Sequence, residues 1–291
     1  MRNKDAFSGY HPTINFLYYA LVLLFSMCLM HPVYLAISLT GALAYAITLN
    51  GQKAVRFAVM GLLPMAALAA LVNPAFNHEG ATILTYFSSG NPLTLESMLY
   101  GLSAGGMLAA VLLWFTTYQA VMTSDKFVYL FGRAIPALSL VLSMTLRFVP
   151  KFRAQLRAVQ QARQFAGNSE KTGPIQKVRT SVENFSILVT WSLENAVETA
   201  DSMRARGYGL PGRTAFSIFR FESRDARLLA WLLACGGLVI FGWAAGTLAW
   251  RYYPTVRGGF TGLTALCAAA ELALALTPWA IDAWEARKWN S

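Results

Sequence analysis

Charged residues are scarce in this chain: it has 291 residues, and only 13% of them are Asp, Glu, Lys or Arg. An ordinary soluble domain carries about a quarter charged residues. Hydrophobic residues make up 56% of the sequence, and the mean hydropathy is +0.44. The shortage of charge excludes an ordinary soluble protein and predicts that most of the chain lies in a lipid bilayer.

Cysteine is also rare and scattered. Cys28, Cys235 and Cys267 each stand alone in an apolar segment. Three widely separated cysteines argue against a disulfide framework and against a cysteine metal site. We expect all three to pack as small buried hydrophobic side chains.

Catalytic and phosphate-binding patterns are missing as well. His11, His31 and His78 lack the spacing of metal ligands, so we expect them at helix caps or on the surface. The sequence contains no G-x-x-x-x-G-K-S/T phosphate loop. It also lacks the Asp, Glu or His cluster at the cytoplasmic interface that an integral-membrane enzyme such as a lipid transferase would need. We therefore predict a non-catalytic chain that binds no cofactor of its own.

Apolar runs long enough to cross a bilayer, which takes about 20 residues, recur along the chain. They extend from Ile14 to Met30, Val33 to Leu49, Phe57 to Val72, Leu93 to Met122, Leu228 to Trp250 and Phe260 to Ile281. Because their boundaries are not sharp, five to seven spans are possible. The predicted fold is an all-α integral membrane protein with five to seven transmembrane helices.

Lysine and arginine are unevenly distributed between the two sides of these spans. With a cytoplasmic N-terminus, 22 of the 24 cations fall in cytoplasmic segments, and only Arg251 and Arg257 fall outside. Positive loops favour the cytoplasm, so we predict a multi-pass plasma-membrane protein with both termini inside. The same asymmetry accounts for the net charge of +10 without a nucleic-acid partner.

A long segment separates the fourth span from the fifth, which gives residues 1–123, 124–225 and 226–291 as the predicted divisions of the chain. Pro136 and Pro150 are expected to break or kink this segment. An amphipathic helix is predicted from Arg147 to Ala166, with Gly167 and Asn168 as its stop. Its apolar stripe includes Phe148, Phe152, Leu156 and Val159.

A second amphipathic helix is predicted to follow, over about 29 residues. Its stripe includes Val182, Phe185 and Val189, and Gly207, Gly209, Pro211 and Gly212 end it. Both helices are predicted to lie in the cytoplasm.

Each of these helices finishes with an arginine next to small residues: Ala162-Arg163-Gln164 in the first and Ala205-Arg206-Gly207 in the second. Such an arginine can offset the negative end of the helix dipole or attract anionic lipid. Small neighbours also let the backbone approach a partner closely, so that a planar guanidinium can enter an acidic groove. Spacing alone leaves these alternatives open.

Several motifs in this region resemble one protein family. ADSMRARGYGLPGR, at residues 200–213, is similar to the second coupling motif of the transmembrane T component (EcfT) of energy-coupling factor (ECF) transporters. TSDKFVYLFG and LSMTLRFVP, which lie upstream, are also similar to members of this family. The resemblance covers nearly the whole chain and is densest between Trp114 and Asp225.

The resemblance implies a scaffold that joins two ABC-type ATPases to a small membrane protein, the S component, which selects a vitamin or a transition-metal ion. It implies that Arg206 docks in one ATPase and Arg163 in the other, and that the partner ATPases bind ATP and Mg²⁺. The apolar stripes of both helices would support the S component. Gln164 departs from the family pattern, which has a small residue on each side of the arginine. The alternative is a conventional ABC importer permease that lines its own substrate path.

Two further features leave alternatives open. Glu271 stands in the middle of the last apolar run, where a carboxyl group either makes a structural polar contact or takes part in proton coupling. The segments GLSAGG and GALAYA place small residues on transmembrane faces and so permit close packing, either within the chain or with the S component.

Overall fold

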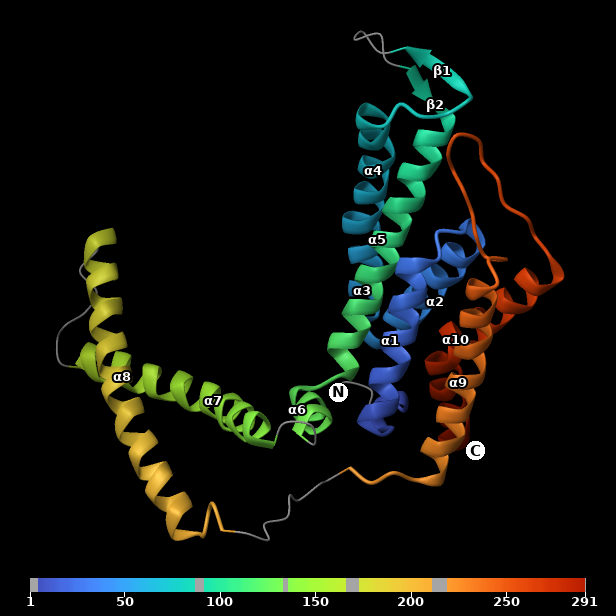
Figure 1. Cartoon of the computed structure of the whole chain (residues 1–291). Helices are drawn as coiled ribbons and strands as arrows, with labels where there is room; N and C mark the ends of the chain where they lie inside the picture. Colours follow the sequence, from blue (N-terminus) through green and yellow to red (C-terminus); the bar gives the residue numbers. More distant parts are fainter. Residues whose placement is uncertain (1–4, 87–91, 133–135, 166–172, 211–218, 291) are drawn as a thin grey trace. The chain divides into compact units, whose positions relative to one another are not determined.

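The computed structural model describes residues 5–86, 92–132, 136–165, 173–210 and 219–290 (Figure 1). The chain divides into two compact units. The first consists of Met1–Thr123 together with Phe219–Ser291, and the second consists of Ser124–Ile218.

Helices, most of them long and apolar, make up the first unit. They are α1 (Pro12–Cys28), α2 (Pro32–Asn50), α3 (Gln52–Phe57), α4 (Leu63–Phe76), α5 (Leu95–Val121), α9 (Ser223–Ala244) and α10 (Gly262–Asn290). A π-helical stretch, Ala58–Leu62, connects α3 to α4. In the described part of the chain, five helical stretches are long and apolar enough to cross a membrane, and α1 is a shorter apolar helix. The prediction of an all-α membrane protein is confirmed.

Two segments predicted as membrane helix have other structures. The predicted span from Leu228 to Trp250 ends early, because α9 stops at Ala244 and Gly246 adopts a left-handed φ of 72°. The fourth predicted span begins with β2 (Pro92–Thr94), which pairs antiparallel with β1 (Ile83–Tyr86). A run of apolar residues in the sequence reveals neither a turn at a single glycine nor the pairing of two segments as strands.

Histidine side chains cap the first two long helices, α1 and α2. The Nδ1 atoms of His11 and His31 accept hydrogen bonds of 3.3 Å from the backbone N–H groups of Thr13 and Val33. In each helix the next residue is a proline at the first helical position, where its missing N–H costs nothing. The expected cap role is therefore seen at both histidines.

The core of the first unit is rich in aromatic residues that carry a polar atom. Tyr18 and Tyr34 donate from their hydroxyls to the backbone carbonyls of Ala275 and Thr264, which belong to α10, at 3.3 and 2.8 Å. A buried tyrosine needs such a partner. These bonds therefore fix α1 and α2 against α10.

Trp114, which is fully buried on α5, extends this polar network. Its Nε1–H donates to the Ser38 hydroxyl at 2.9 Å, and Ser38 in turn bonds to Ser26 at 2.5 Å. The three residues come from α5, α2 and α1, so the network joins three helices in the middle of the unit.

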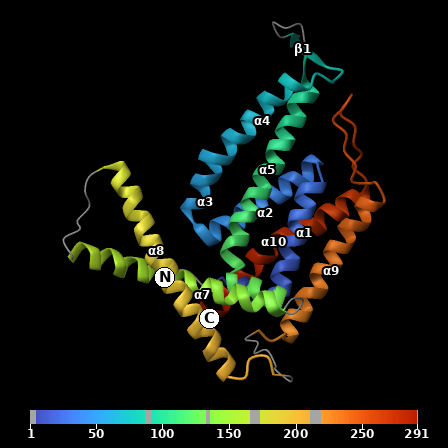
Figure 2. The ribbon, with the colours of Figure 1, turned by 60° about the vertical axis from the view of Figure 1, so that its left-hand side comes forward.

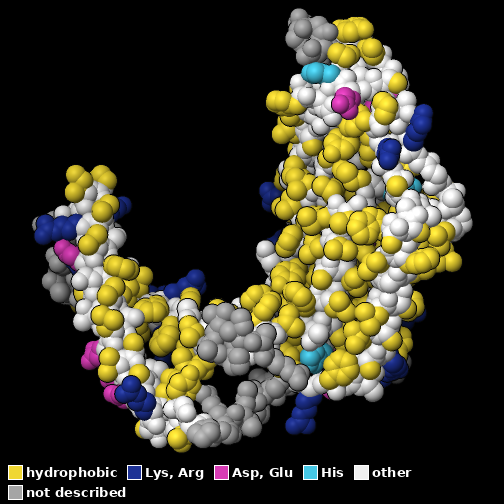
Figure 3. All heavy atoms as spheres, viewed as in Figure 1, with side chains coloured by type: hydrophobic (Ala, Val, Ile, Leu, Met, Phe, Trp, Pro, Cys, Tyr) yellow, Lys and Arg dark blue, Asp and Glu magenta, His cyan; other side chains and the backbone are white. Residues whose placement is uncertain are grey.

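Cysteine behaves partly as predicted. Cys235 and Cys267 are buried, but Cys28 is exposed. Cys28 is the last residue of α1 and lies outside the buried core of the unit. Hydrophobic side chains cover much of the visible face of this unit (Figure 3).

Glycines permit the closest helix contacts in the first unit. A Cβ atom on Gly105 of α5 would lie 2.7 Å from Ala66 Cα of α4, and one on Gly41 of α2 would lie 2.7 Å from Ala275 Cβ of α10. Figures 1 and 2 both show α4 running along α5. The small residues of GLSAGG and GALAYA thus serve packing within this chain.

We expect Gly105→Val to destabilise the first unit by roughly 1–3 kcal/mol, because the new side chain would force α4 away from α5. Gly106→Val is the matched control, since nothing lies within 4 Å of a Cβ atom at Gly106 and the change in helix propensity is the same. Unfolding by SDS titration in mixed micelles measures both variants. Equal stabilities would contradict the close α4–α5 contact.

Candidate functional site

The second unit contains α6 (Ser124–Gly132), α7 (Pro136–Phe165) and α8 (Pro174–Ala205). Helix α7 is longer than predicted, because it continues through Pro150 instead of starting at Arg147. Pro150 is exposed, so the loss of its hydrogen bond does not bury an unpaired carbonyl. The predicted helix stop at Gly167 and Asn168 lies outside the described residues.

An aromatic pair and a polar cluster join α7 to α8. The rings of Phe152 and Trp191 meet edge to face, with their centroids 5.6 Å apart. Asn184 of α8 is buried at 7% exposure. These residues place the contact with α7 on a face of α8 that differs from its predicted apolar stripe.

The two predicted stripes differ in their surroundings. Phe148, Phe152, Leu156 and Val159 on α7 are half-buried. On α8, Val182, Phe185 and Val189 are exposed at 61%, 67% and 40%. Helix α8 therefore presents an open apolar face, while part of the α7 stripe already packs within the unit.

Arg163, from the first predicted motif, is engaged inside the unit. Its guanidinium donates to Asn184 Oδ1 at 2.9 Å and to a carboxylate oxygen of Glu183. The other oxygen of Glu183 accepts from Arg179 Nε at 3.2 Å. We call Arg163, Glu183 and Asn184 the helix clamp, because they hold the end of α7 against α8.

The clamp changes the acidity of its carboxyl group. The pKa of Glu183 lies below its ordinary value, chiefly because Arg163 donates a hydrogen bond to the charged form and secondarily because Arg179 does the same. The carboxylate therefore stays ionised near neutral pH and keeps the clamp closed.

Arg206, from the second predicted motif, lies in a turn at the end of α8. The N–H groups of Gly207 and Tyr208 bond to the carbonyls of Arg204 and Met203 at 2.9 and 3.0 Å. Gly207 has a φ of 77°, a left-handed conformation that glycine adopts at little cost. The backbone conformation therefore favours glycine at position 207. The motif predicts a second role for this glycine, which is to let a partner approach closely. Pro211 and Gly212 lie outside the described residues.

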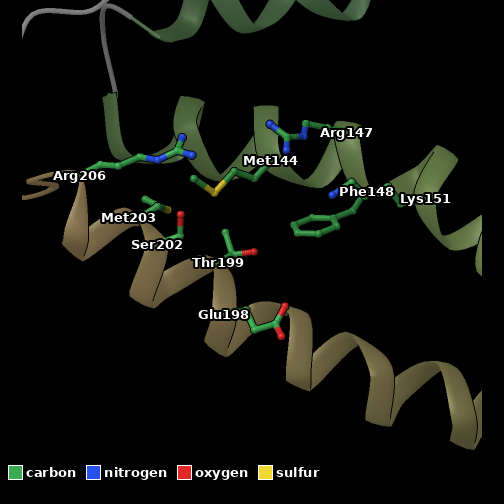
Figure 4. A pocket seen from close by; sticks show the side chains of 9 residues that line it. All are labelled: Met144, Arg147, Phe148, Lys151, Glu198, Thr199, Ser202, Met203 and Arg206. Carbon is green, nitrogen blue, oxygen red and sulfur yellow. The ribbon is translucent and has the colours of Figure 1, made fainter.

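A groove of about 420 Å³ opens beside this turn, and both helices line it (Figure 4). Its cations are Arg147 and Lys151 from α7 and Arg206 from α8, and its single carboxylate is Glu198. Lys151 Nζ lies 5.6 Å from the centre of the Phe148 ring. Among the described residues, none of the three cations forms an ion pair.

Further lining residues give the groove hydroxyl and apolar surfaces. Thr199 and Ser202 supply hydroxyls, and Met144 and Met203 supply thioether side chains. Sequence reasoning singled out Arg206 but not Arg147 or Lys151, because their placement beside Arg206 depends on how α7 crosses α8.

Glu271, in α10, is buried at 4% exposure. Its Oε2 atom has no hydrogen-bond partner in the described part of the chain. The described residues thus show no hydrogen bond from this oxygen to another span. The described residues also contain no group of three or more His, Cys, Asp or Glu side chains that could hold a metal ion.

The long apolar helices define a multi-pass membrane protein, and comparison with known proteins identifies its family. Residues 9–216 match the CbiQ family, which is described as "Cobalt transport protein". This match covers more than half of the chain, which therefore belongs to the CbiQ/EcfT family of transporter transmembrane proteins.

Individual relatives carry the name "Energy-coupling factor transporter transmembrane protein EcfT". The chain is 26% identical to the protein from Listeria innocua over 225 residues, which cover 70% of this chain and 83% of the relative. It is 36% identical to the protein from Lacticaseibacillus paracasei over 110 residues and 31% identical to that from Exiguobacterium sibiricum over 106 residues. These two matches cover 37% and 36% of this chain, and 40% of each relative's length.

We expect Arg163→Ala to loosen the contact between α7 and α8, because it leaves the buried Asn184 oxygen without its donor. Amide hydrogens of α8 near Asn184 should exchange severalfold faster. Arg157→Ala is the control, since Arg157 is an exposed cation on the same helix. Unchanged exchange in Arg163→Ala would show that the clamp does not hold the helices.

Acidification should open the same contact. Because the pKa of Glu183 is lowered in the folded protein, its stabilising effect is present at neutral pH and is lost as the pH falls below 4.5, the ordinary value, towards the lowered pKa. Amide protection in α8 should fall with pH in the wild type. Glu183→Gln should lack this component of the pH dependence, and identical profiles would contradict the assignment.

Proposed function

We propose that this chain is the energy-coupling subunit of an ECF-type importer. It joins two cytoplasmic ABC-type ATPases to a small S component that binds a vitamin or a metal ion. The observation that carries this proposal is the separate unit of two long crossing helices, one of which ends with an exposed arginine beside a cationic groove. Family membership supports it.

In this proposal the second unit and both chain termini lie in the cytoplasm. The positive charge supports this orientation, because the segment between α5 and α9 is strongly basic. The ATPases bind ATP and Mg²⁺, and this chain performs no catalysis.

Arg206 is the proposed anchor for one ATPase. This residue is exposed and makes no ion pair with a described residue, so it can take a carboxylate from a partner without breaking an internal ion pair. Arg163 is the proposed anchor for the other ATPase. It would have to exchange Glu183 for a carboxylate of the partner, which would link docking to the opening of the helix clamp.

The apolar face of α8 is the proposed support for the S component. Val182, Phe185 and Val189 are exposed on it, and removing such apolar side chains from water against a partner is favourable. ATP-driven movement of the two ATPases would shift the arginine-anchored helix ends, and the apolar face would transmit that movement to the S component.

A conventional ABC importer permease is the second candidate. Such a permease would contact its ATPase through one short coupling loop, whereas α7 and α8 span 30 and 32 residues. Transport by this chain and its ATPases in proteoliposomes that contain no S component would favour the permease.

The proposal is tested by purifying the tagged chain in mild detergent with its co-expressed ATPases. We expect the wild type to retain two different ATPases and Arg206→Glu to lose one of them, because the reversed charge repels the acidic partner. Arg204→Glu is the matched control, since it is another exposed arginine in the last turn of α8. If the wild type retains no ATPase, the proposed function is wrong.

A further inference from the structure

The groove at the crossing of α7 and α8 is unbalanced in charge. Arg147, Lys151 and Arg206 line it with only Glu198 to offset them. Arg147 and Lys151 lie one helical turn apart on α7, and Arg206 approaches from the end of α8 (Figure 4). Like charges that outnumber their counter-charges raise the free energy of the free protein, and an anionic partner relieves this cost.

The rest of the lining indicates what kind of anion fits. Thr199 and Ser202 offer hydroxyl donors, so the groove can bind several oxygen atoms at once. Met144, Met203 and Phe148 add apolar surface, and methionine adapts its shape to irregular partners. The complementary ligand therefore carries carboxylates next to apolar side chains.

We propose that Arg147 and Lys151 act together with Arg206 as one composite docking site for an acidic, amphipathic segment of an ATPase. This inference rests on the proposed function and extends it, because it assigns two residues of α7 to the partner of the α8 motif. A volume of about 420 Å³ is far larger than a single phosphate group and suits several side chains of a peptide. The site lies wholly within the second unit.

With a composite site, docking of the ATPase depends on the relative position of α7 and α8 where they cross. A partner that binds the cations of both helices at once holds α7 and α8 in one relative position. A single arginine at a free helix end could not do this. The same ATPase would then fix the helix end and the crossing together.

The test compares two double variants of α7 in the co-purification with both ATPases. Arg147→Glu with Lys151→Glu reverses the groove charges, whereas Arg153→Glu with Arg157→Glu makes the same change in charge at exposed positions outside the groove. We expect the groove variant to lose the ATPase that Arg206→Glu loses, with affinity lower by about tenfold or more. The control variant should retain both ATPases.

Arg147→Gln with Lys151→Gln is a milder double variant. It controls for misfolding caused by the reversed charges, because it removes the cations without adding acidic groups. Loss of the same ATPase by this pair, with an unchanged melting temperature in detergent, supports the composite site. If this pair of substitutions retains both ATPases as well as the wild type does, while Arg206→Glu loses one, the composite site is wrong. The proposed function is then unaffected. Failure of the wild type to retain any ATPase instead removes the proposed function itself.

Mass spectrometry of the co-purified lipids separates a lipid site from a protein site. If the groove variant retains both ATPases but loses bound anionic phospholipid that the control variant keeps, the groove binds a lipid headgroup and the proposal is wrong. Loss of an ATPase with unchanged bound lipid agrees with the composite site.

Discussion

The hydrocarbon interior of a membrane offers no hydrogen-bond partner to a polar group, and the first unit is built around this constraint. Helices satisfy the backbone internally, but buried polar side chains still need partners in neighbouring helices. Tyr18 and Tyr34 use carbonyls of α10, and Trp114 uses the Ser38 hydroxyl. Each of these bonds joins helices that are distant in sequence, so the constraint that selects helices also fixes their arrangement.

The second unit follows different physics, because its helices are only half apolar. One aromatic contact and the helix clamp of Arg163, Glu183 and Asn184 join α7 to α8, and much apolar and cationic surface is left open. Two helices held by few contacts can change their crossing at a low free-energy cost. That property suits a part that responds to partners, whereas the densely joined first unit suits a stable frame.

The two arginine motifs look alike in sequence but occupy different environments. Arg163 is paired across the helix crossing, whereas Arg206 lies exposed in a glycine turn beside a groove that other cations share. Local sequence separates them only through Gln164, because the difference in environment arises from residues about twenty positions away on another helix. For the same reason the sequence did not predict that Arg147 and Lys151 line a groove with Arg206, because their proximity depends on how α7 packs against α8.

The sequence by itself determined the membrane class, the apolar helices and the amphipathic pair, because these follow from composition and local periodicity. It also placed the small residues that let α4 approach α5. Tertiary structure decided where α9 ends, that α7 continues through Pro150, which face of α8 is covered and which arginine is paired. Those outcomes depend on contacts between segments that are distant in the chain, and a pattern within one segment does not contain that information.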